Sequence, residues 1–235
     1  MGPKMPPRAV VFDAYGTLLD VHAAMAKHAG RLGPNWPRIS ADWRQKQLEY
    51  SWIRSLAGPS HHRDFWRLTQ EALAWTAARH GVTDEAVLAD VLMAYRQLDP
   101  YPEVPDLLRQ IRDRKLPVGV LSNGEPDMLA DAIRSAGLDE LLDFVLSIET
   151  IGVFKPAPRV YRLAEEQLKL PSNQIAFVSS NAWDAFGAHA FGFQVFWVNR
   201  TGLPAEYSLR EGATELPDLA ALPEALGMTT PRGPE

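Results

Sequence analysis

The chain has 235 residues, of which 46% are apolar and 23% are charged, and its net charge is -5. This acidic balance argues against a nucleic-acid-binding surface and gives no sign of attraction to membranes. The sequence holds no cysteine, which excludes disulfides and thiolate metal sites. No apolar run approaches the roughly 20 residues of a membrane-spanning helix. The length suits one α/β domain, with or without a smaller insert.

The two ends of the chain are expected to be loose. Residues 1–8 are too short and too rich in proline to be a secretory signal peptide, which favours a cytoplasmic location. Residues 229–235 carry two prolines and a glycine. We therefore predict loose tails over residues 1–7 and 229–235.

A short buried strand opens the structured part of the chain. Residues 9–12 are all apolar and lead directly into Asp13, a pattern typical of a parallel strand covered on both faces. Gly16 allows a tight turn after it. Ligands of open α/β sheets bind at the carboxyl ends of strands, where Asp13 can act as nucleophile, metal ligand or base. Capping of the next turn is an equally good explanation of Asp13 at this point.

A helical segment follows, with helical periodicity and few strand signals from about residue 21 to residue 98. We expect a subdomain over residues 21–99, inserted into a core formed by residues 8–20 and 100–225. Within it, Ser40 is predicted to cap a helix that continues through residues 42–56. Apolar residues fall on two stripes of this helix, which predicts that one side packs on its own subdomain and the other faces a cleft. One stripe holds Ile39, Trp43, Tyr50 and Ile53, and the other holds Leu48, Trp52 and Leu56.

Arg44 and Gln45 flank the second of these stripes. An arginine at the edge of an apolar stripe commonly extends its charge into water. The alternative is a cation that faces an apolar pocket. The sequence of the helix alone favours the first interpretation.

From about residue 104 strands and helices alternate, which predicts an α/β fold with a parallel sheet flanked by helices. The expected strands cover residues 117–121, 144–147, 174–178 and 193–198. The expected helices cover residues 107–115, 126–135 and 159–170, with a short helix, rich in small residues, that ends at Gly192.

Polar residues follow three of the expected strands: Asp13, the pair Ser122 and Asn123, and the run 179–184. Lys155 lies in a loop before a proline, where helical geometry is disfavoured. Because parallel strands end at one edge of a sheet, we expect these groups to converge in an active site. Residues 122–124 also precede a helix, so they can bind an anion or form a simple cap and turn.

Four segments resemble the four motifs of the haloacid dehalogenase superfamily: residues 13–18, 121–124, 155–156 and 179–184. Tyr15, the run 179–184 and residues 43–50 resemble in particular the (S)-2-haloacid dehalogenases, also called type II L-2-haloacid dehalogenases. The resemblance covers about residues 8–200. It implies a Rossmann-like core with an inserted helical cap.

The resemblance also separates dehalogenation from phosphate ester hydrolysis. Phosphatases of the superfamily keep an acid–base aspartate where this chain has Tyr15, and acidic magnesium ligands where it has Ser179, Ser180 and Asn181. A departing halide needs no proton, so loss of the acid is harmless for dehalogenation. We expect no metal or other cofactor. The alternatives are a phosphohydrolase acting on a small phosphate ester and a non-catalytic binding module that kept the fold.

The resemblance implies a hydrolase that converts short 2-haloalkanoic acids to 2-hydroxy acids with inversion. Asp13 would attack the halogen-bearing carbon and form an ester, while Arg44 stabilises the halide. Asp184 would orient or activate the hydrolytic water. Supporting roles are implied for Ser122 (substrate carboxylate), Lys155 (keeping Asp13 ionised), Thr17 (a hydrogen bond to Asp13), Ser179 and Asn181 (water), and Tyr161. The expected substrate-binding residues are Tyr15, Gln45, Leu48, Phe65, Asn123 and Trp183. The expected partners are the 2-halo acid and halide, with no nucleic acid or membrane and a possible homodimer.

Overall fold

The computed structural model describes residues 5–228 and contains a six-stranded sheet in the order β3-β2-β1-β4-β5-β6. All five neighbouring pairs are parallel. This arrangement confirms the predicted α/β class. Of the expected tails at 1–7 and 229–235, residues 1–4 and 229–235 lie outside the described residues. The strands are β1 (Ala9–Phe12), β2 (Val118–Ser122), β3 (Phe144–Ser147), β4 (Ile175–Ser179), β5 (Gln194–Val198) and β6 (Ala213–Leu216).

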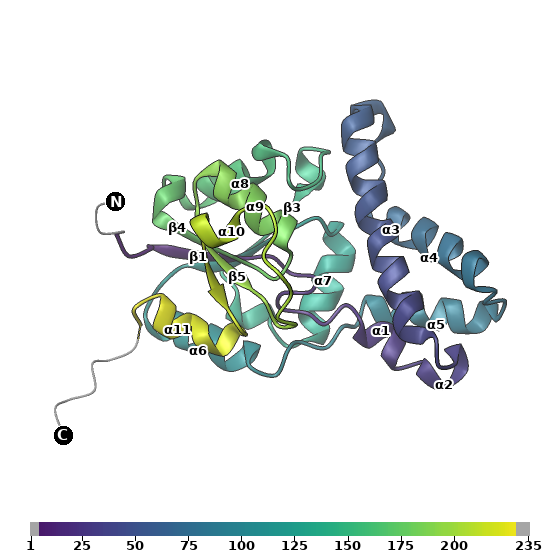
Figure 1. The fold of residues 1–235 in the computed structure, drawn as a ribbon. Coiled ribbons are helices and arrows are strands. Elements are labelled where there is room, and N and C mark those ends of the chain that lie inside the picture. The colour runs from purple at the N-terminus through teal and green to yellow at the C-terminus, as the bar shows by residue number, and fades with distance from the viewer. Residues whose placement is uncertain (1–4, 229–235) are drawn as a thin grey trace, which may run out of the picture.

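Helices cover both faces of this sheet, and in Figure 1 α8 and α9 lie above it while α6 and α11 lie below. These helices and their neighbours are α6 (Val104–Asp113), α7 (Pro126–Ser135), α8 (Pro158–Leu168), α9 (Ala182–Phe191), α10 (Leu209–Gly212) and α11 (Leu222–Ala225). Single 3₁₀ turns occur at Pro59–His61, Asp139–Leu141, Ile148–Thr150, Ser172–Gln174 and Leu219–Ala221. No helix within residues 5–228 is both long and apolar enough to cross a membrane.

Five helices separate β1 from α6 along the chain, and Figure 1 shows them beside the sheet rather than on its faces. They are α1 (Ala23–Ala26), α2 (Ala29–Leu32), α3 (Trp36–Ala57), α4 (Phe65–His80) and α5 (Glu85–Tyr95). The segment leaves and returns at one point, because Asp20 N donates to Asp99 O over 3.0 Å and Leu19 forms a β-bridge with Pro100. Its two ends are therefore held together by backbone contacts.

Helix α3 begins at Trp36, so the prediction that Ser40 caps it is wrong. Pro37 lies in the first turn, where its fixed φ favours the helix and its missing N–H costs nothing. Ser40 lies inside the helix and is buried, with its hydroxyl oxygen 2.7 Å from Nδ1 of His22. The proline allowed the helix to start one turn earlier than the serine suggested.

The arrangement expected of the two stripes on α3 is found in part, because Ile39 and Trp43 are buried while Trp52 and Leu56 border a pocket. The buried positions are Ile39, Ser40, Trp43, Gln47 and Ser51, which form one stripe at helical spacing. The far ends of both expected stripes face solvent, since Ile53 is 60% exposed and Leu56 is 84% exposed. An apolar pattern could not reveal this face, because three of its five members are polar.

Strand β1 lies in the middle of the sheet, and its four residues are fully buried. Phe12, its last residue, pairs with Val120 of β2 and Val178 of β4. The three strands thus end side by side, and Asp13 N donates to Val178 O over 2.9 Å. The register brings the residues after β1, β2 and β4 to one edge of the sheet, as the sequence predicted.

Strand β6 and the short helices around it were not predicted. Only one of the four residues of β6, Leu216, is buried, and two are exposed. The strand lies at the edge of the sheet, paired with β5 alone. A polar edge strand carries little hydrophobic signal, which explains why periodicity missed it.

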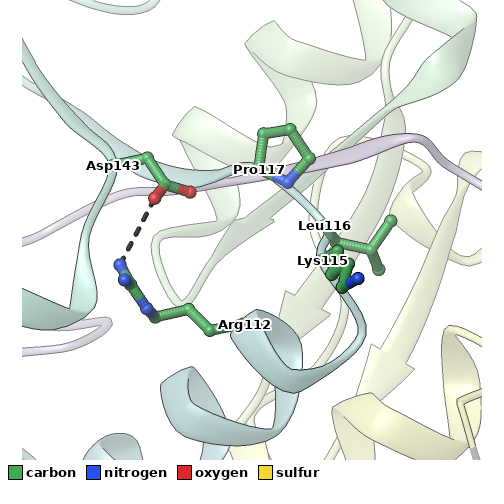
Figure 2. Close-up of a pocket in the computed structure, with 5 residues that line it drawn as sticks. All are labelled: Arg112, Lys115, Leu116, Pro117 and Asp143. Carbon is green, nitrogen blue, oxygen red and sulfur yellow. Dashed lines mark hydrogen bonds and ion pairs between the residues drawn. The ribbon is translucent and has the colours of Figure 1, made fainter.

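A pocket of about 400 Å³ opens at the amino-terminal end of β2, away from the strand ends that hold Asp13. Figure 2 shows Arg112 and Asp143 paired across it, with 3.3 Å between Nη1 and Oδ1. The other carboxylate oxygen of Asp143 accepts from the N–H of Val118 over 2.8 Å. This charge therefore supports the start of β2, and the pocket takes no part in the site described next.

Candidate active site

Lys155 forms the centre of the predicted site, between two carboxylates. Its Nζ lies 3.1 Å from Oδ1 of Asp13 and 2.8 Å from Oδ2 of Asp184. Asp13 follows β1, Asp184 lies in the first turn of α9, and Lys155 lies in the loop before α8. All three are almost fully buried, and Lys155 is 1% exposed. Such a charge cluster is stable only when its members pair with one another.

The second oxygen of Asp13 is held by two further groups. Oδ2 accepts from the Thr17 hydroxyl over 3.1 Å and from Nδ2 of Asn181 over 2.8 Å. Thr17 in turn accepts from the N–H of Ser180 over 2.8 Å, and Ser179 Oγ accepts from the N–H of Asn181 over 3.2 Å. The structure contains the expected hydrogen bond from Thr17 to Asp13, and the bonds donated by Ser180 and Asn181 join the first and fourth motifs directly.

Asp184 is buried and accepts from the Tyr161 hydroxyl over 2.8 Å. Burial raises the pKa of Asp184 to about 6; Lys155 and the Tyr161 hydrogen bond oppose this rise, and the charge of Asp13 adds to it. A carboxyl group with a pKa in this range is ionised at neutral pH yet basic enough to accept a proton. Asp184 therefore has the properties of a general base.

Lys155 and Tyr161 keep their protons in this environment. Burial lowers the pKa of Lys155, but the charges of Asp13 and Asp184 outweigh it and the net shift is upward. Burial raises the pKa of Tyr161 well above its usual value, and Asp184 adds to the rise. Lys155 thus stays a cation between two carboxylates, and Tyr161 stays a neutral donor to Asp184.

The turn after β2 ties the second motif to the third. Asn123 Oδ1 accepts from the backbone N–H of Lys155 over 2.9 Å, and Ser122 Oγ accepts from Gly124 N over 3.0 Å. The amino terminus of α7, however, is capped by Glu125, whose carboxylate accepts from the N–H groups of Asp127 and Met128. The cap expected of residues 122–124 is therefore supplied by Glu125. An anion bound here must be held by the turn itself.

Arg44 reaches the core from α3. Its Nη2 donates to the carbonyl oxygen of Tyr15 over 3.3 Å. Within the described part of the chain, Arg44 Nη1 and the Tyr15 hydroxyl are buried without a hydrogen-bond partner. Unpaired buried donors are rare because they lose their hydration without compensation. Of the two interpretations of Arg44, the structure favours the cation that faces a pocket.

Aromatic rings surround the Asp13 turn. The Tyr15 ring lies 6.5 Å from that of Phe65, the first residue of α4, and both are buried. Trp183 packs edge-to-face on Trp52 of α3 at 5.5 Å. Arg44, Asn181 and Trp183 border a cavity of about 770 Å³ next to this cluster. Of the other two residues on α3 that were expected to line the pocket, Leu48 is half-buried and Gln45 is exposed.

Gly187 on α9 is a site residue that the sequence did not single out. A Cβ at this position would overlap the Tyr161 hydroxyl and lie 2.6 Å from Cβ of Pro156. Glycine thus allows α9 to approach the loop of Lys155 closely enough for Tyr161 to reach Asp184. The available signal was a glycine in the middle of a helix of small residues, where alanine would otherwise be favoured.

The donor set does not fit a metal ion. Within residues 5–228 no three His, Asp or Glu side chains gather closely enough to hold one. The position between Asp13 and Asp184, where two carboxylates would share a cation, is filled by Nζ of Lys155. Magnesium needs several oxygen ligands, and the ammonium group takes the place at which they converge.

Comparison with known proteins places this site in a family. Residues 7–192 match the family model of haloacid dehalogenase-like hydrolases. (S)-2-Haloacid dehalogenase 1 of Pseudomonas sp. (strain CBS-3) is 43% identical over 222 residues, which cover 94% of this chain and 97% of that protein. The L-2-haloacid dehalogenase of Xanthobacter autotrophicus, solved with chloropropionic acid covalently bound, is 37% identical with a TM-score of 0.84, covering 95% of this chain and all of that one.

A dehalogenase solved with an intermediate complex gives a TM-score of 0.91 at 39% identity, covering 94% of this chain and 97% of that one. The chain therefore belongs to the haloacid dehalogenase-like hydrolases and, among them, to the (S)-2-haloacid dehalogenase family.

The acid–base properties of Asp184 can be tested without substrate. In ¹³C NMR of aspartate-labelled protein, with Asp184→Asn to assign the resonance, we expect the carboxyl group to titrate near pH 6. Tyr161→Phe removes a hydrogen bond that lowers this pKa, so the midpoint should rise. Gly187→Ala should move it in the same direction by displacing the hydroxyl. Gly30→Ala is the control, since nothing lies within 4 Å of its Cβ. An unchanged midpoint in Tyr161→Phe would contradict the assigned contact.

Proposed function

We propose that this protein hydrolyses short (S)-2-haloalkanoic acids to 2-hydroxy acids with inversion, through an ester of Asp13. The observation that carries the proposal is the carboxylate of Asp13, held by Lys155, Thr17 and Asn181, together with Arg44, whose Nη1 is buried without a partner within the described residues. Asn181 connects the nucleophile to the cation, because its Nδ2 donates both to Asp13 and to the carbonyl oxygen of Tyr15, which also accepts from Arg44. The covalently bound chloropropionic acid of the Xanthobacter relative supports the same chemistry.

In the first step an oxygen of Asp13 attacks C2 of the substrate on the side opposite the halogen. The new C–O bond forms as the C–halogen bond breaks, and the halide leaves with the bonding electron pair. Arg44 stabilises the growing negative charge, and it does so more strongly than in water because its surroundings are largely apolar. The substrate carboxylate is held by the turn of Ser122 and Asn123.

In the second step water attacks the Asp13 carboxyl carbon of the ester, and Asp184 accepts its proton. The C–O bond between this carbon and the product then breaks, Asp13 is released as carboxylate, and the 2-hydroxy acid takes up a proton. Lys155 holds both carboxylates in place throughout, and Tyr161, Ser179 and Asn181 orient the groups around the water.

The alternative, a phosphohydrolase, is supported less well. Its leaving group needs an acid, and the position two residues after Asp13 holds Tyr15, whose pKa burial raises well above its usual value. It also needs a metal for the phosphate charge, at a place where Lys155 lies. We therefore propose that the reaction needs no metal.

We further propose the division of the chain into a core of residues 8–20 and 100–225 and a cap of residues 21–99. The joined ends of the helical segment at Asp20 and Asp99 support this division. So does the origin of the site, because Arg44, Leu48 and Phe65 come from the segment and the nucleophile does not. The cytoplasmic location and the absence of a nucleic-acid partner remain predictions from the sequence.

The reaction is tested by measuring halide release from fluoro-, chloro- and bromoacetate and from both enantiomers of 2-chloropropanoate, with and without EDTA. We expect release from the (S) enantiomer that EDTA leaves unchanged. Asp13→Asn removes the nucleophile and should abolish release, whereas Asp106→Asn, an exposed aspartate on α6, should not. Hydrolysis of phosphate esters alone, dependent on magnesium, would overturn the proposal.

The rate should depend on pH through Asp184. The group must be ionised to accept a proton from water, so turnover should be full above its pKa of about 6 and fall at lower pH. The loss should lie in hydrolysis of the ester, which then accumulates and can be detected by mass spectrometry of acid-quenched enzyme. Turnover that is independent of pH between 5 and 7 would remove Asp184 from the role of base.

A homodimer is proposed from the apolar residues that α3 presents to solvent. Ile53 and Leu56 are 60% and 84% exposed, and Leu56 borders a pocket that the exposed Phe186 and Tyr207 also line. Light scattering should give a mass of about twice 26.2 kDa. Replacing Leu56 by aspartate should reduce it to that of one chain, and a wild-type protein that is monomeric at high concentration would rule the dimer out.

A further inference from the structure

Tyr95, the last residue of α5, joins the helical segment to the turn of the nucleophile. It is 1% exposed, and its ring stacks on that of Tyr15 with 5.6 Å between centroids and 3° between planes. The same ring packs against Trp43 of α3 at 4.9 Å. Trp43 immediately precedes Arg44. One buried tyrosine therefore contacts both the residue next to the cation and the aromatic residue two positions after Asp13.

The hydroxyl of Tyr95 ends a buried chain of hydrogen bonds. It lies 3.2 Å from Oε1 of Gln47, whose Nε2 lies 3.0 Å from Oγ1 of Thr69. Thr69 Oγ1 lies 2.8 Å from the carbonyl oxygen of Phe65. The three side chains are buried, so each group must satisfy its hydrogen bonds within this chain.

The last acceptor determines the direction of every bond in this chain. A carbonyl oxygen cannot donate, so the single hydroxyl proton of Thr69 points to Phe65. Thr69 must then accept from Gln47, which turns the amide nitrogen of Gln47 to Thr69 and its oxygen to Tyr95. Tyr95 must donate its own proton to that oxygen. The phenolic oxygen of Tyr95 is therefore available only as an acceptor.

Arg44 is the candidate for the matching donor. It lies three residues before Gln47 on α3, so the two side chains occupy neighbouring positions on the helix surface. Burial raises the pKa of Tyr95, and the nearby charge of Arg44 and the hydrogen bond that Tyr95 donates to Gln47 offset part of the rise. The guanidinium also donates to the carbonyl oxygen of Tyr15. This contact holds Nη2, while Nη1 has no partner within the described residues.

We propose that Tyr95 is a positioning residue for halide release: its oxygen accepts from Arg44 and its ring holds Tyr15, so that the free N–H of Arg44 points at the departing halide. The inference rests on the proposed dehalogenation. It assigns to α5 a part in the first chemical step and none in the hydrolysis of the ester. The hydrogen bonds from Phe65 to Tyr95 orient the phenolic oxygen of Tyr95 as an acceptor. The stacking of the Tyr95 ring on Tyr15 fixes the position of that oxygen.

The test compares Tyr95→Phe with Ser51→Ala. The first keeps the ring and removes the acceptor; the second removes a buried hydroxyl from α3 two turns beyond Arg44. In a single turnover of (S)-2-chloropropanoate, Tyr95→Phe should slow halide release by about tenfold or more, as expected for loss of one hydrogen bond to a charged group. The loss should be smaller with the bromo acid, whose leaving group is better, and ester hydrolysis should keep its rate. Ser51→Ala should leave all three quantities within twofold of wild type.

Bromide binding, measured by titration without turnover, separates this proposal from the proposed function. Tyr95→Phe should bind bromide more weakly, and adding it to Arg44→Ala should weaken binding no further, because the two residues act through one contact. Wild-type bromide binding and halide release in Tyr95→Phe, with only a lower melting temperature, would make Tyr95 a packing residue. A wild-type protein that releases no halide would instead overturn the function, while the bromide titration would still decide the link between Tyr95 and Arg44.

Discussion

The ion pairs of Lys155 with Asp13 and Asp184 are the constraint on which the rest of the structure depends. Two buried carboxylates repel each other and lose their hydration, and one ammonium group between them offsets both costs. Removing one partner from a buried pair typically costs about 3–5 kcal/mol, so the fold must bring the three residues into contact. Three features do this: the central position of β1, the short helix α9, and Gly187, which lets α9 approach Tyr161. The chemistry and the stability of the core thus share one cluster.

The same cluster gives its two aspartates different roles in the proposed reaction. Asp13 is oriented by donors on both oxygens, whereas Asp184 is oriented by Lys155 and Tyr161 and has its pKa moved towards neutrality by burial. Two aspartates with different surroundings can therefore serve as nucleophile and base in turn. In the proposed reaction the cation for the halide is Arg44 of the helical segment, so that attack and departure would occur on opposite sides of the substrate carbon.

Most of the core could be predicted from the sequence, because its signals are local and apolar. The continuous run before Asp13, the proline at the start of α7 and the glycine after α9 located their elements closely. The prediction failed where polar residues are buried by partners far along the chain. Gln47 and Ser51 form part of the packed face of α3, and Gln47 owes its place to Thr69 and Tyr95. The contacts of Thr17, Asn181 and Asp184 could be predicted from the motifs and the strand register. The importance of Gly187 and Tyr95 could not, because it depends on side-chain packing that only the structure shows.

The joined ends of the helical segment have an evolutionary consequence. Because Asp20 and Asp99 meet through backbone groups, the core reaches the same geometry whatever length of chain lies between them. Arg44 and Tyr95 lie in that segment, whereas Asp13, Lys155 and Asp184 lie outside it. A descendant protein could therefore replace the segment and accept a substrate with a different leaving group, while its nucleophile stays the same. Substrate selectivity and reactivity can thus evolve separately.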